Sequence, residues 1–216
     1  MTTATKRLIH VSSPPAQLEG VLELPENANG VILFAHGSGS GRFSPRNQYV
    51  ASMLRSGGLG TLLIDLLEKW ESDDRDKVFD IDLLSERLLA TTDWLETDVE
   101  TENLPIGYFG ASTGAAAALQ AASQREEIQA IVSRGGRPDL AINYLSQVET
   151  PTLLIVGGDD WPVIPYNEQA YKQLTGTKEI VIVPGATHLF EEPGKLEIVA
   201  DLARNWFEKH LTINLE

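Results

Sequence analysis

A chain of 216 residues with 42% hydrophobic residues can bury one sizeable core but is short for two, so we expect a single domain over residues 1–216. The formal net charge of −14 opposes binding to nucleic acid, and the lack of cysteine excludes disulfides, thiolate nucleophiles and sulfur-ligated metal sites. Since neither a long apolar run nor an apolar N-terminal signal segment is present, we expect a cytoplasmic protein with no membrane partner.

Apolar runs alternate with helical patterns along the chain, which is typical of a mostly parallel sheet with helices on both faces. Residues 6–12 and 17–24 alternate at period two around a turn at residues 13–16, which predicts an antiparallel hairpin at one edge of the sheet. Six further strands are predicted at residues 31–35, 59–65, 104–109, 128–133, 152–156 and 179–183. The sequence therefore predicts an α/β fold with an eight-stranded sheet.

Helices between these strands are indicated by apolar residues that recur on one face. One such face carries Ile81, Leu84, Leu88 and Leu95, and the last helix carries Leu196, Val199, Ala203, Trp206 and His210. These faces predict packing against the sheet. The most polar stretch, residues 68–77, is interpreted as an ordinary charged loop.

A serine lies between two glycines at the end of the fifth predicted strand. Gly110 and Gly114 stand two residues before and after Ser112, and an alanine-rich helix follows. This strand–turn–helix context is that of a nucleophile elbow, in which a strained turn projects the hydroxyl. Asp160 and His188 follow in the chain order serine, acid, histidine that completes such a triad.

His188 is the histidine best placed to accept the serine proton. His10 lies in the opening hairpin, His36 inside a glycine-rich turn and His210 at the end of the last helix. His188 instead follows a strand directly, and the loops at the carboxyl ends of parallel strands form the ligand crevice of an open sheet. A carboxylate on the other ring nitrogen is needed to orient the imidazole, and the candidates are Asp160 and its neighbour Asp159.

Four motifs fall at the ends of the third, fifth, seventh and eighth predicted strands. They are His36-Gly37-Ser38-Gly39, Gly110-Ala111-Ser112-Thr113-Gly114, Gly157-Gly158-Asp159-Asp160-Trp161-Pro162-Val163 and Gly185-Ala186-Thr187-His188-Leu189-Phe190. In this arrangement the chain resembles the α/β-hydrolase superfamily and, within it, the dienelactone hydrolase-like family. The resemblance covers nearly the whole chain. It implies an α/β-hydrolase fold with the oxyanion turn after the third strand.

The resemblance also implies roles for single residues. Family spacing favours Asp160 over Asp159 as the acid. The backbone amides of Thr113 and of the Ser38 region are the expected oxyanion hole. Dienelactone hydrolases proper carry a cysteine at the elbow where this chain has Ser112, which makes lactone specificity doubtful.

The loops expected to form the rim of the predicted site are residues 42–46, 69–70, 134–144 and 161–166, and their arginines suggest a locally positive mouth. These are Arg42, Arg46, Arg134 and Arg137, and the segment 134–150 is too short for a cap domain. We hypothesise a shallow site in which Arg42 and Arg137 bind an anionic group of the substrate. The alternative is that these arginines pair with the acidic surplus of the chain. Trp161 beside the acid is expected either to wall the acyl pocket or to pack in the interior.

The sequence therefore predicts a serine hydrolase acting on small-molecule carboxylic esters, with no cofactor and no metal. One alternative is a non-catalytic binding protein with the same fold. Another is a dinucleotide-binding turn at residues 37–41, which we disfavour because Arg42 stands where the fingerprint requires its third glycine.

Overall fold

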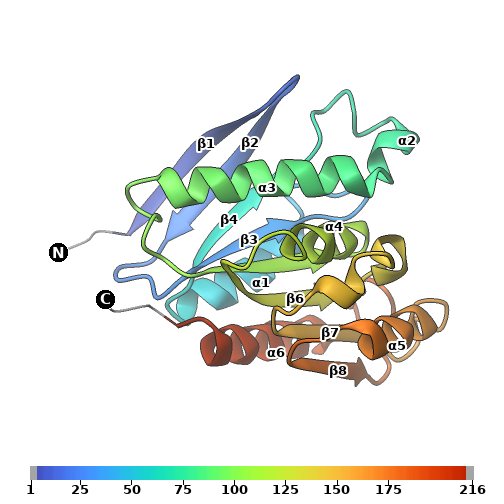
Figure 1. The fold of residues 1–216 in the computed structure, drawn as a ribbon. Helices are drawn as coiled ribbons and strands as arrows, with labels where there is room; N and C mark the ends of the chain where they lie inside the picture. Colours follow the sequence, from blue (N-terminus) through green and yellow to red (C-terminus); the bar gives the residue numbers. More distant parts are fainter. Residues whose placement is uncertain (1–3, 213–216) are drawn as a thin grey trace.

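One sheet of eight strands forms the centre of the computed structural model, which describes residues 4–212 (Figure 1). The strands are β1 (Thr5–Ser13), β2 (Ala16–Leu24), β3 (Val31–Ala35), β4 (Gly60–Ile64), β5 (Ile106–Ala111), β6 (Ile128–Arg134), β7 (Thr152–Gly157) and β8 (Lys178–Val183). Their order in the sheet is β1-β2-β4-β3-β5-β6-β7-β8. The pairs β1–β2 and β2–β4 are antiparallel and all others are parallel, so the predicted mostly parallel sheet with an N-terminal hairpin is confirmed.

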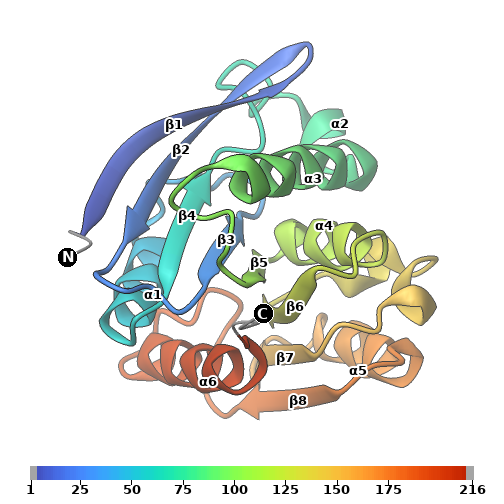
Figure 2. The same ribbon diagram turned by 60° about the vertical axis from the view of Figure 1, so that its left-hand side comes forward.

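Helices cover both faces of the sheet. They are α1 (Pro45–Ser56), α2 (Arg75–Val78), α3 (Ile81–Thr97), α4 (Thr113–Ala122), α5 (Ile164–Gln173) and α6 (Lys195–His210), with short 3₁₀ helices at Pro138–Ala141 and Leu145–Gln147. Figure 2 shows α3, α4 and α5 on one face and α1 and α6 on the other. Two apolar clusters fill the layers between helices and sheet. Within residues 4–212, no helix combines the length and apolar character that a membrane crossing requires.

The burial pattern explains why these segments form strands. Every residue of β3, β4, β5 and β7 is buried, because parallel strands in the middle of the sheet have helices on both sides. The outer strand β1 instead alternates between buried and exposed residues. The predicted α3 face is buried throughout. In α6, Val199, Ala203 and Trp206 are buried, while Leu196 and His210 are half-buried.

Some boundaries differ from those predicted by the apolar runs. The first turn is shorter than residues 13–16, because Ser13 and Ala16 pair with each other in the β1–β2 ladder. The strand predicted to begin at residue 104 begins at Ile106, since Pro105 has no backbone N–H to donate to a neighbouring strand. Neither shift changes which face of the sheet a side chain occupies.

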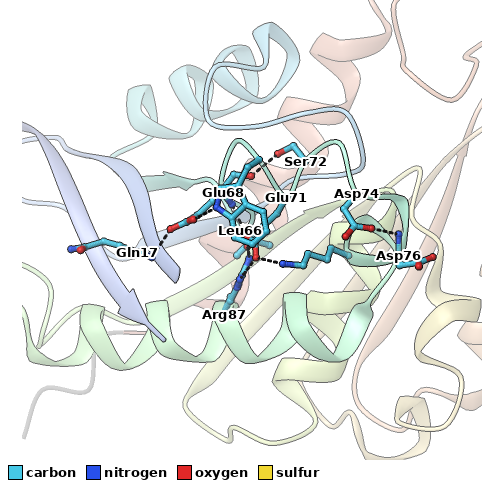
Figure 3. A network of polar contacts seen from close by, with 10 residues as sticks. Gln17, Leu66, Glu68, Glu71, Ser72, Asp74, Asp76 and Arg87 are labelled. Atoms are coloured by element: carbon cyan, nitrogen blue, oxygen red, sulfur yellow. Dashed lines mark hydrogen bonds and ion pairs between the residues drawn. The ribbon is translucent and has the colours of Figure 1, made fainter. Parts of the chain in front are cut away.

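The charged stretch at residues 68–77 is not an ordinary solvated loop, because a buried ion pair anchors it to α3 (Figure 3). Glu71 is 1% exposed and Arg87 is 2% exposed. The guanidinium donates from Nη1 to Glu71 Oε2 at 2.6 Å and from Nη2 to Oε1 at 3.0 Å. Lys77 Nζ lies 2.7 Å from the same Oε1. These hydrogen bonds, chiefly those from Arg87, lower the pKa of Glu71 from 4.5 to about 2.

Breaking this pair is expected to be strongly destabilising. In Glu71→Gln the buried guanidinium of Arg87 loses its counter-charge, which typically costs about 3–5 kcal/mol in the free energy of unfolding. The pKa of Glu71 is lower in the folded than in the unfolded chain, so the carboxylate contributes stability above about pH 4.5. That contribution is lost as the pH falls toward 2. Urea unfolding measured at several pH values between 7 and 2.5 should therefore show that the difference in unfolding free energy between wild type and Glu71→Gln becomes smaller as the pH falls.

The matched control is Asp73→Asn, which removes a charge from an exposed position in the same loop. Its unfolding free energy at pH 7 should stay within about 0.5 kcal/mol of wild type. A Glu71→Gln variant as stable as this control would contradict a structural role for the pair.

Candidate active site

Ser112 occupies a sharp turn between β5 and α4. Its backbone angles are φ 52° and ψ −120°, a conformation that a residue with a side chain adopts only when the surroundings impose it. A Cβ added to Gly110 would lie 2.4 Å from Ala115 Cα, and one added to Gly114 would lie 2.1 Å from the Ala35 carbonyl oxygen. Only glycine fits at either position. The two glycines therefore let α4 approach the sheet closely, as the elbow motif predicts.

Asp160 and His188 contact each other at the carboxyl ends of β7 and β8. His188 Nδ1 lies 2.7 Å from Asp160 Oδ2. The Asp160 side chain is 8% exposed, whereas the imidazole is 37% exposed. Because a carboxylate can only accept, Nδ1 carries the hydrogen and Nε2 is left free to accept a proton. The competing candidate Asp159 has an exposed side chain, so the structure brings Asp160 to the histidine.

The turn after β6 connects the serine to the histidine. The Ser112 N–H donates to the Arg134 carbonyl at 3.2 Å. The next residue, Gly135, has φ +51°, and a Cβ added there would lie 3.4 Å from His188 Nδ1. The backbone of residues 134–135 thus hydrogen-bonds to Ser112 and lies next to His188. Ser112, Asp160 and His188 are far apart in the sequence, and all three follow the carboxyl ends of parallel strands.

The turn after β3 packs against the elbow. A Cβ added to Gly37 would lie 2.9 Å from Ser112 Cβ, so only a glycine permits this approach. Ser38 follows in an exposed position, and Thr113 is the first residue of α4. The first amides of a helix have no acceptor within the helix. The Thr113 N–H, next to the serine, therefore has no acceptor within α4, and its role in an oxyanion hole stays a prediction.

A cavity of about 720 Å³ adjoins this turn. Its walls come from residues 17–19 of β2, residues 39–46 and the anchored loop at residues 65–72. Phe43 and Trp70 line it with side chains that are 72% and 63% exposed. Two of the predicted rim segments, 42–46 and 69–70, are thus part of its lining. The other two segments, 134–144 and 161–166, do not line this cavity.

Trp161 follows the acid directly and is 74% exposed. It is therefore not a packing residue of the interior. Its position beside Asp160 leaves it available at the surface near the candidate site.

Arg42 and Arg137 have carboxylate partners within the chain. The Arg42 guanidinium forms ion pairs with Asp65 and with Glu19, the latter at 2.5 Å. Arg137 donates to both carboxylate oxygens of Asp139, at 2.8 and 2.7 Å. These hydrogen bonds raise the pKa of Arg137 above its ordinary value. Both contacts match the alternative in which the arginines pair with acidic groups of the chain. A substrate-binding role for them stays a prediction.

The two remaining arginines of the predicted mouth differ from each other. Arg46 pairs with Glu191 at 2.6 Å. Arg134 is 7% exposed, and its Nε and Nη1 have no hydrogen-bond partner among residues 4–212. Burial, and to a lesser extent the charge of Arg46, lower the pKa of Arg134 to about 10. Three of the four arginines at the locally positive mouth that the sequence suggests are thus paired with carboxylates of the chain. Which carboxylates lie beside these arginines could not be predicted from sequence spacing.

His36 has contacts that its place in a glycine-rich turn does not reveal. The side chain is 7% exposed and hydrogen-bonds to the backbone of Gly37 and Leu66. Neither His10 nor His210 is buried in this way. His10 is exposed on β1, and His210 packs against the Trp206 ring with centroids 4.3 Å apart.

Comparisons with known proteins agree with this fold. The model of the dienelactone hydrolase family matches residues 19–212. A dienelactone hydrolase from Anabaena variabilis is 54% identical, with a TM-score of 0.93 over 97% of this chain and 100% of that one. Est1E from Butyrivibrio proteoclasticus shares the fold at 16% identity, with a TM-score of 0.80 over 94% of this chain and 98% of that one.

The curated relatives from Mycobacterium tuberculosis carry a different name. A "Putative phosphoribosyl transferase" of that organism is 53% identical over 204 residues, which is 94% of this chain and 46% of the relative. The chain thus spans about half the length of the curated relatives that it matches.

Proposed function

Because the chain belongs to the dienelactone hydrolase family, we propose that it is a serine hydrolase that cleaves small-molecule carboxylic esters through an acyl-enzyme intermediate. Family and fold support a hydrolase in general. The proposal of a serine hydrolase rests on the 2.7 Å contact between Asp160 and His188. This contact lies at the carboxyl ends of the parallel strands, where the Ser112 elbow also lies.

In the proposed reaction, Ser112 Oγ attacks the ester carbonyl carbon while His188 Nε2 takes the hydroxyl proton. Asp160 keeps the other ring nitrogen protonated and stabilises the imidazolium. The amides of Ser38 and Thr113 stabilise the negative oxygen of the tetrahedral intermediate. His188 then donates its proton to the leaving alcohol. A water molecule, activated by the same imidazole, releases the acid and restores the serine.

The site favours small substrates. Residues 134–150 between β6 and β7 hold only two short 3₁₀ helices, so no cap domain is inserted there. A cavity of about 720 Å³ adjoins the oxyanion turn, although Ser112, Asp160 and His188 are not among its lining residues, and we propose that it receives a small acyl or alcohol group. We propose esters first, with lactones and thioesters as further substrates to be compared.

The transferase name of the M. tuberculosis relatives is compatible with a hydrolase here. This chain matches 46% of their length, and we propose that any phosphoribosyl transfer belongs to the remainder. A binding protein without turnover is the other alternative, because a triad does not by itself prove catalysis.

A serine-reactive fluorophosphonate and a series of p-nitrophenyl esters of increasing acyl length test the proposal. We expect stoichiometric labelling of the folded protein and the highest kcat/KM on short acyl chains. Folded protein that neither reacts with the probe nor hydrolyses any ester would support the binding protein instead. Release of pyrophosphate from phosphoribosyl pyrophosphate would support the transferase.

The ion pairs of the arginines lead to a prediction about substrate charge. Since Arg42 and Arg137 already contact carboxylates of the chain, replacing either by alanine should lower kcat/KM by the same factor on a neutral ester and on its carboxylate-bearing analogue. Steady-state kinetics on the two esters measures this ratio. A loss confined to the carboxylate-bearing ester would instead favour the hypothesis that these arginines bind an anionic group.

A further inference from the structure

We propose that His36 is a positioning residue of the oxyanion hole, because its imidazole orients the peptide group that carries the Ser38 N–H. This inference rests on the proposed function and assigns to it a residue outside the triad. It follows from the two hydrogen bonds of the ring and from the planarity of the peptide group.

The two ring nitrogens of His36 have opposite roles. Nε2 lies 2.9 Å from the Leu66 backbone nitrogen, which can only donate, so Nε2 is the acceptor and carries no hydrogen. Nδ1 lies 3.0 Å from the Gly37 carbonyl oxygen and therefore carries the hydrogen of the neutral ring. Burial, the largest influence on this group, lowers the pKa of His36 and keeps the ring neutral at pH 7.

The Gly37 carbonyl and the Ser38 N–H belong to one peptide group. That peptide is trans, so its C=O and N–H point in opposite directions. The carbonyl is held by two donors, Nδ1–H of His36 and the Ser40 N–H at 3.2 Å. Fixing the carbonyl toward the buried imidazole turns the Ser38 N–H to the opposite side of the peptide group, and Gly37, the residue that carries this carbonyl, approaches Ser112 closely.

A buried network fixes the imidazole in turn. The Leu66 carbonyl accepts from Arg87 Nη1 at 2.8 Å, and the same guanidinium pairs with Glu71 (Figure 3). The Leu66 backbone is thus held on one side by Arg87 and on the other by His36. The ion pair beneath the loop at residues 65–72 is connected in this way to the oxyanion turn.

An oxyanion-hole donor interacts more strongly with the transition state than with the ester, so its misalignment lowers kcat and leaves KM nearly unchanged. Two substitutions separate the two hydrogen bonds of the ring. In His36→Asn the side-chain amide nitrogen can replace Nδ1 and donate to the Gly37 carbonyl. In His36→Gln the amide oxygen can replace Nε2 and accept from Leu66.

We expect His36→Gln to lower kcat about 10²-fold at unchanged KM, the loss that follows removal of one oxyanion donor. His36→Asn should retain at least about a tenth of the wild-type kcat, although both variants lose one hydrogen bond and some thermal stability. The control His10→Gln changes an exposed histidine on β1 and should leave both constants unchanged. Equal kcat losses in the Asn and Gln variants, or wild-type kcat in His36→Gln, would overturn the positioning role.

Nitrogen NMR of the histidine rings gives a readout that does not depend on turnover. The imidazole of His36 should be the neutral Nδ1–H tautomer at pH 7. An Nε2–H tautomer would overturn the inference even in a fully active enzyme. Wild-type protein that hydrolyses no ester but shows the expected tautomer would contradict the proposed function, and the proposed role in the oxyanion hole would fall with it.

Discussion

Replacing Ser112 by alanine is expected to lower kcat on a p-nitrophenyl ester by at least about 10⁴-fold, because the attacking oxygen is lost while the oxyanion amides remain. Alanine keeps the Cβ atom, so the φ angle of 52° is as strained in the variant as in the wild type. The fold should therefore be unchanged, and the loss should be chemical. Steady-state kinetics measures the loss of kcat, and circular dichroism checks that the fold is unchanged.

The matched control is Ser123→Ala, which removes a hydroxyl just beyond the other end of α4. It should retain wild-type kcat and full labelling by the fluorophosphonate, whereas Ser112→Ala should not be labelled. Ser38→Ala retains its backbone amide and should be far milder than Ser112→Ala. More than a tenth of the wild-type kcat in folded Ser112→Ala would show that another group is the nucleophile.

Asp160→Asn is expected to lower kcat about 10⁴-fold near neutral pH. The carboxylate accepts the Nδ1–H of His188 at 2.7 Å, whereas an amide nitrogen at that place would donate. The ring would then keep its hydrogen on Nε2, the nitrogen that has to take the serine proton. A pH–rate profile of the variant measures this, with hydroxide at high pH expected to restore part of the rate.

Asp159→Asn is the matched control, because it makes the same chemical change one residue earlier, at an exposed side chain. Its kcat should stay within about twofold of wild type. Comparable losses in the two variants would mean that the charge of the whole turn is needed, and the orienting role assigned to Asp160 would be wrong.

Most of the fold was predictable because its signals are local. Buried parallel strands are short apolar runs, and the glycines around Ser112 mark a turn that no other residue could make. The polar turns that follow the strands could be placed together at the carboxyl ends of the sheet, because parallel strands share their direction.

The sequence pattern does not give the position of partners that are distant in sequence. The charged stretch at residues 68–77 was expected to be solvated, but Glu71 meets Arg87 in the interior. For Arg42 the sequence leaves two roles open; its ion pairs with Asp65 and Glu19 match pairing within the chain, and a substrate-binding role stays a prediction. In both cases the residue types show that an ion pair can form, but the spacing of residues along the chain does not give the position of the opposite charge.

The sequence alone therefore determined the succession of strands and helices along the chain, the elbow, and a short set of candidate residues for acyl transfer, since backbone preferences and the spacing of apolar residues act over a few positions. The tertiary structure decided which acid reaches His188, which arginines are neutralised, and how His36 is held between Gly37 and Leu66. A hydrogen bond or an ion pair depends on distances of a few ångströms between side chains, and only the packed chain sets those distances.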